Sequence, residues 1–265
     1  MLKNKNCVIY GASPSLGGAV ARQMARAGAK VFVTNRHAEL AQNVADQINS
    51  EGGFAEAAEV DAMDENAVQL HLDAIGKKFG VVDISFNLIG IDVLQDIPLI
   101  EMKVDEFVRP ITDAMHTHFI TATAAGRLMS KQGSGVILTL TATPGGIGYP
   151  GVGGFGPLCC AMEGFSRNLA TELGPSGVRA VNIRSGGSLD SRPFKEATVT
   201  GALEVQAIFD KMKGDTMLKD LPSMDDIAST AVFLSSDMAR KITGVTIDIT
   251  VGTTAALNYR TNGDF

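Results

Sequence analysis

The stretch NCVIYGASPSLGG, from Asn6 to Gly18, decides the fold class of this chain. Its first half is a short apolar run typical of a buried strand, and Leu16 begins a segment of helical period that ends near Ala27. Glycines between a strand and a helix let the backbone approach a pyrophosphate, and the free amides at the helix start hold its charge. The stretch therefore predicts a dinucleotide-binding strand-turn-helix unit.

The rest of the chain continues this alternation of short β-branched runs and longer helical segments. Further strands are predicted at 30–34, 54–59, 83–86, 135–140, 179–183 and 245–249, and further helices at 38–50, 64–79, 104–131, 155–173 and 225–234. This alternation implies βαβ crossovers. Such crossovers predict an α/β fold of the doubly wound Rossmann type, a seven-stranded parallel sheet with helices on both faces. In a fold of this type, ligands bind at the carboxyl ends of the strands.

Two local sequence features are expected to interrupt or loosen the predicted helices. Pro110 lacks an amide hydrogen and is expected to break the helix at 104–131. The glycines between 151 and 156 indicate a late or loose start for the helix at 155–173.

Length, charge and cysteine content limit the class of protein. With 265 residues, 45% of them hydrophobic, and no linker-like segment, the chain is predicted to form a single domain over 1–265. The net charge of −6 leaves no basic field for a nucleic-acid partner. The apolar run before Gly11 is too short for a signal sequence, and no segment approaches the roughly 20 apolar residues of a membrane span. We expect a cytoplasmic protein with reduced thiols and no metal site.

The end of the second predicted strand bears on cofactor choice. An NAD-selective loop places an acid there for the adenosine ribose 2′-hydroxyl, but this chain has Asn35 and Arg36. Arg36 can pair with a 2′-phosphate, and Asn35 can hydrogen-bond beside it, which favours NADP(H) over NAD(H). The alternative is that Arg36 is a solvated loop cation.

From residue 11 to about 252 the chain resembles the short-chain dehydrogenase/reductase superfamily. Besides the glycine-rich loop, the resemblance rests on YPG at 149–151, EG at 163–164, GVR at 177–179, FLSSD at 233–237 and TG at 243–244. It implies a Rossmann fold, a nicotinamide cofactor and oxidoreductase activity. The cofactor contacts that it implies, together with the residues above, are Gly11, Ser13, Ser15, Leu16, Gly17, Asn35, Arg36, Asp61, Ala62, Asn87, Gly90 and Gly186.

Two of these positions depart from the superfamily's pattern. Ser15 stands where the intermediate glycine of the loop is expected, and the segment from Asn87 to Gly90 is a variant of the Asn-Asn-Ala-Gly element. Asp61 is placed like the acid that contacts the adenine amine.

The same resemblance places four changed residues where the superfamily carries its proton relay. Ala142 stands at the serine, Phe155 at the tyrosine acid and Cys159 at the lysine, while a count along the preceding long helix puts Ala114 at the asparagine. A phenyl ring has no acidic proton, and a neutral thiol adds no charge that would lower a phenol pKa. Between residues 145 and 173 the only tyrosine is Tyr149 and there is no lysine, so the absence does not depend on register.

Three residues are candidate replacements for this relay. His118, one turn after Ala114, is expected to titrate near neutrality; its alternative is a polar role at a subunit interface. Thr141 and Tyr149 border the site and can orient a carbonyl through their hydroxyls, although such hydroxyls commonly satisfy local backbone groups. Cys159 is favoured as a small apolar packing residue over a nucleophile, because no cation close in sequence lowers its pKa.

Two functions from different classes remain open. The first is an NADP(H)-dependent oxidoreductase of the short-chain dehydrogenase/reductase type with a non-standard active site, acting on a small molecule. The alternative is a nucleotide-binding pseudoenzyme or sensor, or a non-redox enzyme such as a cyclase, on the same fold.

The resemblance also implies a lid and an assembly. A substrate lid is expected around residues 186–222, with 190–220 as the least regular part of the chain and Met212 and Met217 on its apolar inner face. The two long helices, near 111–131 and 155–173, are expected to pair copies of the chain into a homodimer or homotetramer.

Overall fold

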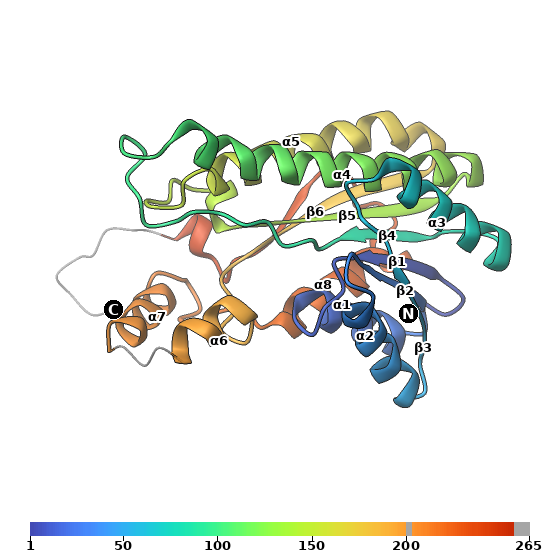
Figure 1. The fold of residues 1–265 in the computed structure, drawn as a ribbon, viewed down its shortest axis with the longest axis horizontal. Helices are drawn as coiled ribbons and strands as arrows, with labels where there is room; N and C mark the ends of the chain where they lie inside the picture. Colours follow the sequence, from blue (N-terminus) through green and yellow to red (C-terminus); the bar gives the residue numbers. More distant parts are fainter. Residues whose placement is uncertain (200–202, 257–265) are drawn as a thin grey trace.

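The strands form one parallel seven-stranded sheet in the order β3-β2-β1-β4-β5-β6-β7 (Figure 1). The computed structural model describes residues 1–199 and 203–256, so the last part of the predicted single domain lies outside the described residues. The strand order reverses between β1 and β4, which is the doubly wound Rossmann arrangement and confirms the predicted fold class. The strands are β1 (Asn6–Tyr10), β2 (Lys30–Asn35), β3 (Phe54–Glu59), β4 (Ile84–Asn87), β5 (Gly135–Ala142), β6 (Val178–Ser185) and β7 (Thr246–Ile249).

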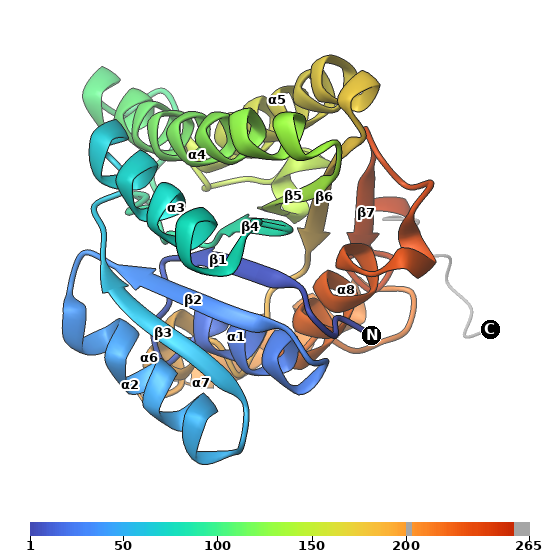
Figure 2. The same cartoon turned by 90° about the vertical axis from the view of Figure 1, so that its right-hand side faces the viewer.

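Helices cover both faces of the sheet (Figure 2). One layer holds α3, α4 and α5, and the other holds α1, α2 and α8. Within the described residues, no helix is both long enough and apolar enough to cross a membrane. The bounds are α1 (Leu16–Arg26), α2 (Ala38–Ser50), α3 (Glu65–Phe79), α4 (Val104–Gln132), α5 (Phe155–Leu173) and α8 (Met224–Ser235).

The two layers explain why β1 is buried along its whole length. Successive strand side chains point to opposite faces. Cys7 and Ile9 therefore pack under the layer of α1, α2 and α8, whereas Val8 and Tyr10 pack under the layer of α3 and α4. A parallel strand covered on both sides has no solvated face, and all five residues of β1 are buried.

The expected break at Pro110 is wrong. Pro110 lies inside the continuous helix α4 and is buried. A Cβ atom added at Gly154 would lie 3.1 Å from Cγ of Pro110, so the ring packs directly against the start of α5. Tertiary packing thus holds the helix together across the missing amide hydrogen.

The expected loose start of α5 is also wrong. This helix begins at Phe155, and Gly154 comes so close to the carbonyl of Phe107 on α4 that a Cβ atom there would overlap its oxygen. The neighbouring Gly153 has φ of 52°, in the left-handed region that favours glycine. The glycines therefore permit close packing of α4 and α5.

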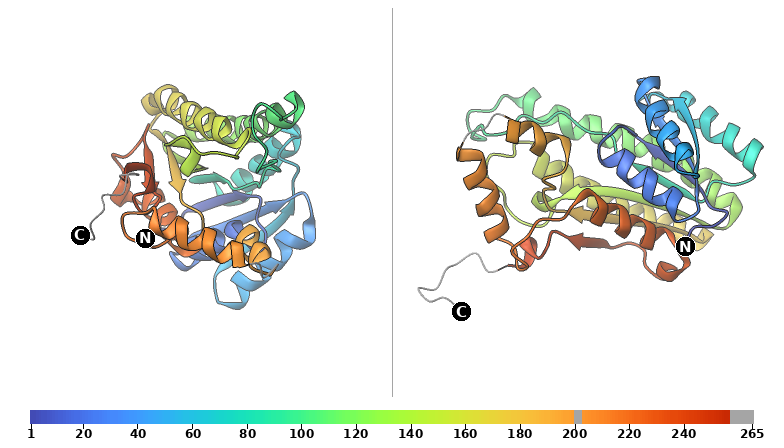
Figure 3. Two further views of the ribbon diagram at one scale, coloured as in Figure 1. Left: turned by 90° about the vertical axis from the view of Figure 1, so that its left-hand side faces the viewer. Right: turned by 90° about the horizontal axis from the view of Figure 1, so that it is seen from below.

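The predicted lid is more regular than the sequence indicated. It contains two helices, α6 (Arg192–Val199) and α7 (Leu203–Gly214), which lie beyond the carboxyl ends of the strands (Figures 1 and 3). The rings of Phe194 and Phe209 join them, with centroids 5.5 Å apart. Residues 200–202 lie outside the described residues. The expectation of an irregular segment is wrong, while its role as a lid stays a prediction.

Of the two methionines assigned to the inner face of this segment, Met212 lies against Gly187 in the turn that follows β6. Met217 instead packs part of its side chain on Gly252 and is 54% exposed.

Candidate functional site

The loop after β1 has a geometry that only glycine permits. Gly11 has φ of 78°, and a Cβ atom there would lie 2.7 Å from the carbonyl oxygen of Leu88. A Cβ atom at Gly17 would lie 2.5 Å from the carbonyl oxygen of Gly11, so the start of α1 rests directly on the end of β1. This close approach leaves backbone amides as the lining of the loop, as a pyrophosphate site requires.

The start of α1 keeps an uncompensated positive end. Its N-cap residue, Ser15, makes no side-chain capping hydrogen bond, and the first turn carries no acidic residue. The carbonyl of Ser13 accepts the amide of Gly18, but side chains satisfy none of the first-turn amides. The helix dipole and these amides favour an anion at Leu16 and Gly17.

The two candidate residues in the turn after β2, Asn35 and Arg36, differ in their hydrogen bonding. Asn35 donates its side-chain amide to the carbonyl of Ala12 at 2.9 Å and accepts the amide of His37 at 3.0 Å. Its carboxamide thus ties β2 to the glycine loop. Arg36 is exposed and has no hydrogen bond or ion pair with any residue that the structure describes. Its guanidinium is free to meet a phosphate.

The other candidate cofactor residues lie at the same edge of the sheet. Asp61 is exposed and accepts the amide of Met63 at 2.9 Å, and Ala62 beside it is buried. Asn87 is buried and donates to the Thr121 hydroxyl at 3.1 Å, so it anchors the turn after β4 to α4. Gly90, further along this turn, is exposed.

One residue missed at the sequence level lies in the turn after β6. The side chain of Ser188 is buried, yet its hydroxyl has no hydrogen-bond partner among the described residues. The same turn contains Gly186, which packs against Pro222, and Asp190, whose carboxylate caps the first amide of α8 at Met224. An unpaired buried hydroxyl is unfavourable by about 1–3 kcal/mol, which a bound ligand or a water can remove. No motif in the sequence marked Ser188.

The four positions assigned to the changed relay meet in one place. Ala114 on α4, Ala142 at the end of β5, and Phe155 and Cys159 on α5 belong to one hydrophobic cluster. We call this set the apolar cluster; its members are Ala114, Leu158, Cys159 and Met162, which are buried, and Ile91, Ile111, Met115, Ala142, Phe155 and Phe165, which are partly buried. Ala114, which a count along α4 selected, thus belongs to the same cluster as the other three positions.

Burial determines the chemistry of Cys159. The side chain is fully buried, and desolvation raises the pKa of its thiol to about 11, although a backbone hydrogen bond from Ala142 acts in the opposite direction. At neutral pH the group is a protonated thiol. Its environment favours packing over nucleophilic attack.

The surroundings of two of the three candidate replacements for the relay disfavour the expected roles. The hydroxyl of Thr141 donates to a carboxylate oxygen of Glu163 at 3.0 Å and accepts from the side chain of Asn182 at 2.7 Å. Burial lowers the pKa of His118 to about 4, so it does not titrate near neutrality as the sequence indicated. Tyr149 lies in the loop before α5 and is 42% exposed.

Two histidines with lowered pKa values, the half-buried His71 and the buried His118, predict a pH dependence of stability. Burial lowers the pKa of His71 and of His118 from 6.5 to about 4. Below pH 6.5 the unfolded chain binds protons that the folded chain does not, so the free energy of unfolding falls as the pH drops from 6.5 to 4, by up to about 3 kcal/mol for each histidine. Urea unfolding across this range measures the loss.

The matched variants for this prediction are His118→Gln and His37→Gln. We expect His118→Gln to reduce the dependence on pH by about half, and His37→Gln, at an exposed position, is the control for the substitution itself. Equal slopes for the wild type and His118→Gln would contradict the assignment.

A charged network beside the apolar cluster was also missed. Arg184 on β6 donates to Glu163 on α5 at 2.8 Å and to Asp248 on β7 at 3.1 Å, and the three side chains are 16%, 12% and 30% exposed. The carboxylate of Glu163 raises the pKa of Arg184 further, so this guanidinium keeps its proton. The available signal was a charged residue, Arg184, directly after a predicted strand of a parallel sheet whose two faces are covered. The network holds α5, β6 and β7 together at the edge of the site.

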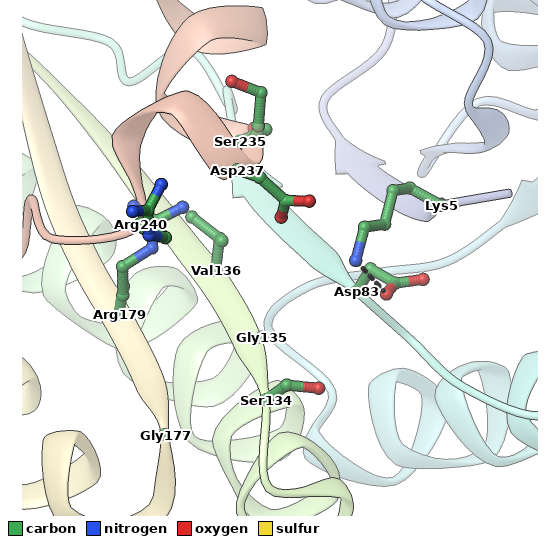
Figure 4. A pocket seen from close by; sticks show the side chains of 11 residues that line it. Lys5, Asp83, Ser134, Gly135, Val136, Gly177, Arg179, Ser235, Asp237 and Arg240 are labelled. Carbon is green, nitrogen blue, oxygen red and sulfur yellow. Dashed lines mark hydrogen bonds and ion pairs between the residues drawn. The ribbon is translucent and has the colours of Figure 1, made fainter. Parts of the chain in front are cut away.

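A separate hollow lies at the opposite edge of the sheet. It has a volume of about 190 Å³ and is lined by residues from the amino ends of the strands and the end of α8. Figure 4 shows Lys5 beside Asp83 on one side and Arg179 with Arg240 on the other, with Asp237 between them. Arg179 is held by the carbonyls of Leu234 and Ile242. These mixed charges lie away from the glycine loop and the apolar cluster.

The fold and the glycine loop define a dinucleotide-binding protein of the Rossmann class, and comparisons with known proteins agree. A family model described as enoyl-(acyl carrier protein) reductase matches residues 11–254. The 3-oxoacyl-(acyl-carrier-protein) reductase FabG of Salmonella typhimurium is 30% identical over 255 residues, covering 94% of this chain and 97% of that protein. The L-rhamnose 1-dehydrogenase (NAD(P)(+)) of Azotobacter vinelandii is 27% identical, covering 93% and 95%.

Solved structures show the same relationship. The 3-ketoacyl-(acyl-carrier-protein) reductase of Brucella melitensis complexed with NADH is 25% identical, with a TM-score of 0.83 and coverage of 96% of this chain and 100% of that one. A short-chain type dehydrogenase/reductase from Mycobacterium marinum is 27% identical, with a TM-score of 0.82 and coverage of 96% of each chain. The chain belongs to the short-chain dehydrogenase/reductase family of NAD(P)-dependent oxidoreductases.

Proposed function

We propose that this protein is an NADP(H)-dependent oxidoreductase of small molecules with a non-standard active site, in which the apolar cluster replaces the proton relay. The observation that carries the proposal is that the four changed positions, from α4, β5 and α5, form one cluster. The glycine loop beside it keeps the close backbone approach that a dinucleotide requires. Cofactor binding is therefore retained while the proton donor is lost.

The residues present fit such a cofactor. Gly11, Gly17 and the free amides of α1 would hold the pyrophosphate, Arg36 the 2′-phosphate, and Asp61 the adenine amine. When bound, the nicotinamide supplies or accepts a hydride. The chain's contribution is to orient the reactants and to exclude water with the apolar cluster.

Arg36 provides the test of cofactor preference. We expect Arg36→Ala to weaken NADPH binding by about tenfold to 100-fold and to leave NADH binding nearly unchanged, because a charge-assisted hydrogen bond to a phosphate contributes about 1.5–3 kcal/mol. Calorimetric titration of both nucleotides measures this difference. Arg26→Ala is the matched control, since Arg26 is an exposed arginine that pairs with Glu51 at the far end of α1.

The outcome that contradicts the preference is an equal loss of affinity for both nucleotides. Turnover is tested by following NADPH oxidation with ketones, enones and iminium ions. If NADPH binds and no substrate class is reduced, the alternative of a nucleotide-binding pseudoenzyme or non-redox enzyme is favoured, because the apolar cluster lacks a proton donor of the usual kind.

We also propose that α4 and α5 pair copies of the chain into a homodimer or homotetramer. Phe119 on α4 is 55% exposed and packs on Phe165 of α5, with ring centroids 6.2 Å apart. An exposed aromatic residue on a helix pair fits a protein interface. Light scattering in solution measures the assembly, and a monomer at all concentrations would contradict it. A cytoplasmic location stays a prediction.

A further inference from the structure

The apolar cluster contains almost no group that can exchange a proton. Of its ten residues, only Cys159 is ionisable, and its thiol is held protonated by burial. Two polar groups beside the cluster are already paired: the Thr141 hydroxyl donates to Glu163, and Glu163 in turn binds Arg184. A substrate that needs a proton from the protein therefore has no donor in this cluster.

Reduction of a ketone produces an alkoxide, which must be protonated, and a positioned acid typically contributes at least about 100-fold to such a step. An iminium ion has no such requirement. When its carbon receives a hydride, the carbon–nitrogen π pair moves to nitrogen and cancels the positive charge. The products are a neutral tertiary amine and the oxidised nicotinamide, so charge and atoms balance with no proton transferred.

The loop beside the apolar cluster has the charge that complements such a cation. Ile91 belongs to the cluster, and the segment that follows it, up to residue 106, carries one basic residue, Lys103, against five carboxylates: Asp92, Asp96, Glu101, Asp105 and Glu106. All of these carboxylates except that of Glu106 belong to exposed residues. Nearby carboxylates raise the local concentration of cations and repel anions.

Backbone contacts hold this acidic loop against the start of α5. The amide of Asp96 donates to the carbonyl of Gly151 at 2.7 Å, and a Cβ atom at Gly153 would lie 2.8 Å from the carbonyl oxygen of Leu94. The loop therefore borders the turn that leads directly into Phe155. The Phe155 side chain is half-buried at the margin of the cluster, where an aromatic face attracts an organic cation by about 1 kcal/mol.

We propose that the substrate of this site is a preformed organic cation, an iminium ion with an apolar body, which receives hydride from NADPH without a proton from the protein. This inference rests on the proposed function. The apolar cluster takes the hydrocarbon body, the ring of Phe155 takes the cationic carbon–nitrogen unit, and the acidic loop attracts the ion.

The test compares two substrates of one bicyclic skeleton, an N-methyl dihydroisoquinolinium ion and the corresponding ketone, with the full-length protein and NADPH. We expect kcat/KM for the ion to exceed that for the ketone by at least about 100-fold. Deuterium from NADPH labelled at the transferred position should appear at the former iminium carbon. A reaction without protein measures the uncatalysed background.

Variants of the acidic loop test recognition of charge. We expect the double variant Asp96→Asn, Glu101→Gln to raise KM for the ion by about tenfold with kcat unchanged, because two attractive charges are lost beside the cluster. Glu39→Gln, at the exposed start of α2, is the matched control and should leave KM unchanged. Calorimetry with a quaternary ammonium of the same skeleton and NADP⁺ gives a readout that needs no turnover, and the double variant should weaken this binding by a similar factor.

The outcomes distinguish the iminium assignment from the proposed oxidoreductase function. Efficient reduction of the ketone, or equal KM values for the ion in the wild type and the double variant, would overturn the iminium assignment and leave the oxidoreductase intact. Failure to reduce either substrate while NADPH is bound would overturn the proposed function and this inference with it.

Discussion

Replacing Cys159 by lysine is expected to lower the free energy of unfolding by about 3–5 kcal/mol, the range found when a buried charge is left without a partner. Cys159 is fully buried in the same cluster as Ala114, Leu158 and Met162, so the longer side chain would also overpack the apolar cluster. The carboxylate of Glu163, one turn away, is already bound by Arg184 and Thr141. Urea unfolding followed by circular dichroism measures the change.

The control for this substitution is Cys159→Ala, which removes one sulfur atom and adds no charge. We expect it to lower stability by about 1 kcal/mol, within the ordinary range for single substitutions. If Cys159→Lys is as stable as Cys159→Ala, the site tolerates an ammonium ion, and the interpretation of the cluster as an apolar replacement of the relay is wrong.

Replacing Gly17 by valine is expected to weaken nucleotide binding by at least about 100-fold, close to loss of binding in an ordinary titration. A Cβ atom at this position would lie 2.5 Å from the carbonyl oxygen of Gly11 and 3.0 Å from Cα of Ala12, so α1 must move away from β1. This movement separates the helix amides from the loop, and the anion site depends on both. Fluorescence titration with NADPH measures the effect.

Gly76→Ala is the matched control for this prediction. Gly76 is also a helical glycine, but no heavy atom lies within 4 Å of an added Cβ, so its replacement should stabilise α3 by about 0.5–1 kcal/mol and leave NADPH binding unchanged. Circular dichroism at low temperature confirms that both variants fold. A folded Gly17→Val protein with wild-type affinity for NADPH would contradict the assigned anion site.

Much of the architecture could be predicted because parallel strands covered on both faces leave a strong local signal. The bounds predicted for β1, β3, α2 and α5 agree with the structure, and the other predicted elements differ by one or two residues at their ends, whereas α6 and α7 were not predicted. Errors arose where distant segments overrule local preference. Pro110 stays within α4, and α5 starts directly after Gly154 without a loose turn, because Gly154 and Pro110 pack against each other.

The candidate site was predicted unevenly for the same reason. The glycine loop is a local motif, so Gly11 and Gly17 were recognisable from a few residues. Ser188 has no motif around it, and only the folded chain shows that its hydroxyl is buried without a partner among the described residues. The roles of Asn35 and Thr141 were likewise invisible, because their hydrogen-bond partners, Ala12 and Glu163, are distant in sequence.

By itself the sequence determined the Rossmann class, since strand and helix periods are properties of neighbouring residues, and it determined that no tyrosine–lysine pair exists between 145 and 173. Only the tertiary structure decided that residues from α4, β5 and α5 close into one apolar cluster, and that Arg184 binds Glu163 and Asp248 beside it. Such contacts depend on how helices pack on the sheet, and packing distances between segments far apart in the chain are not encoded in any local pattern.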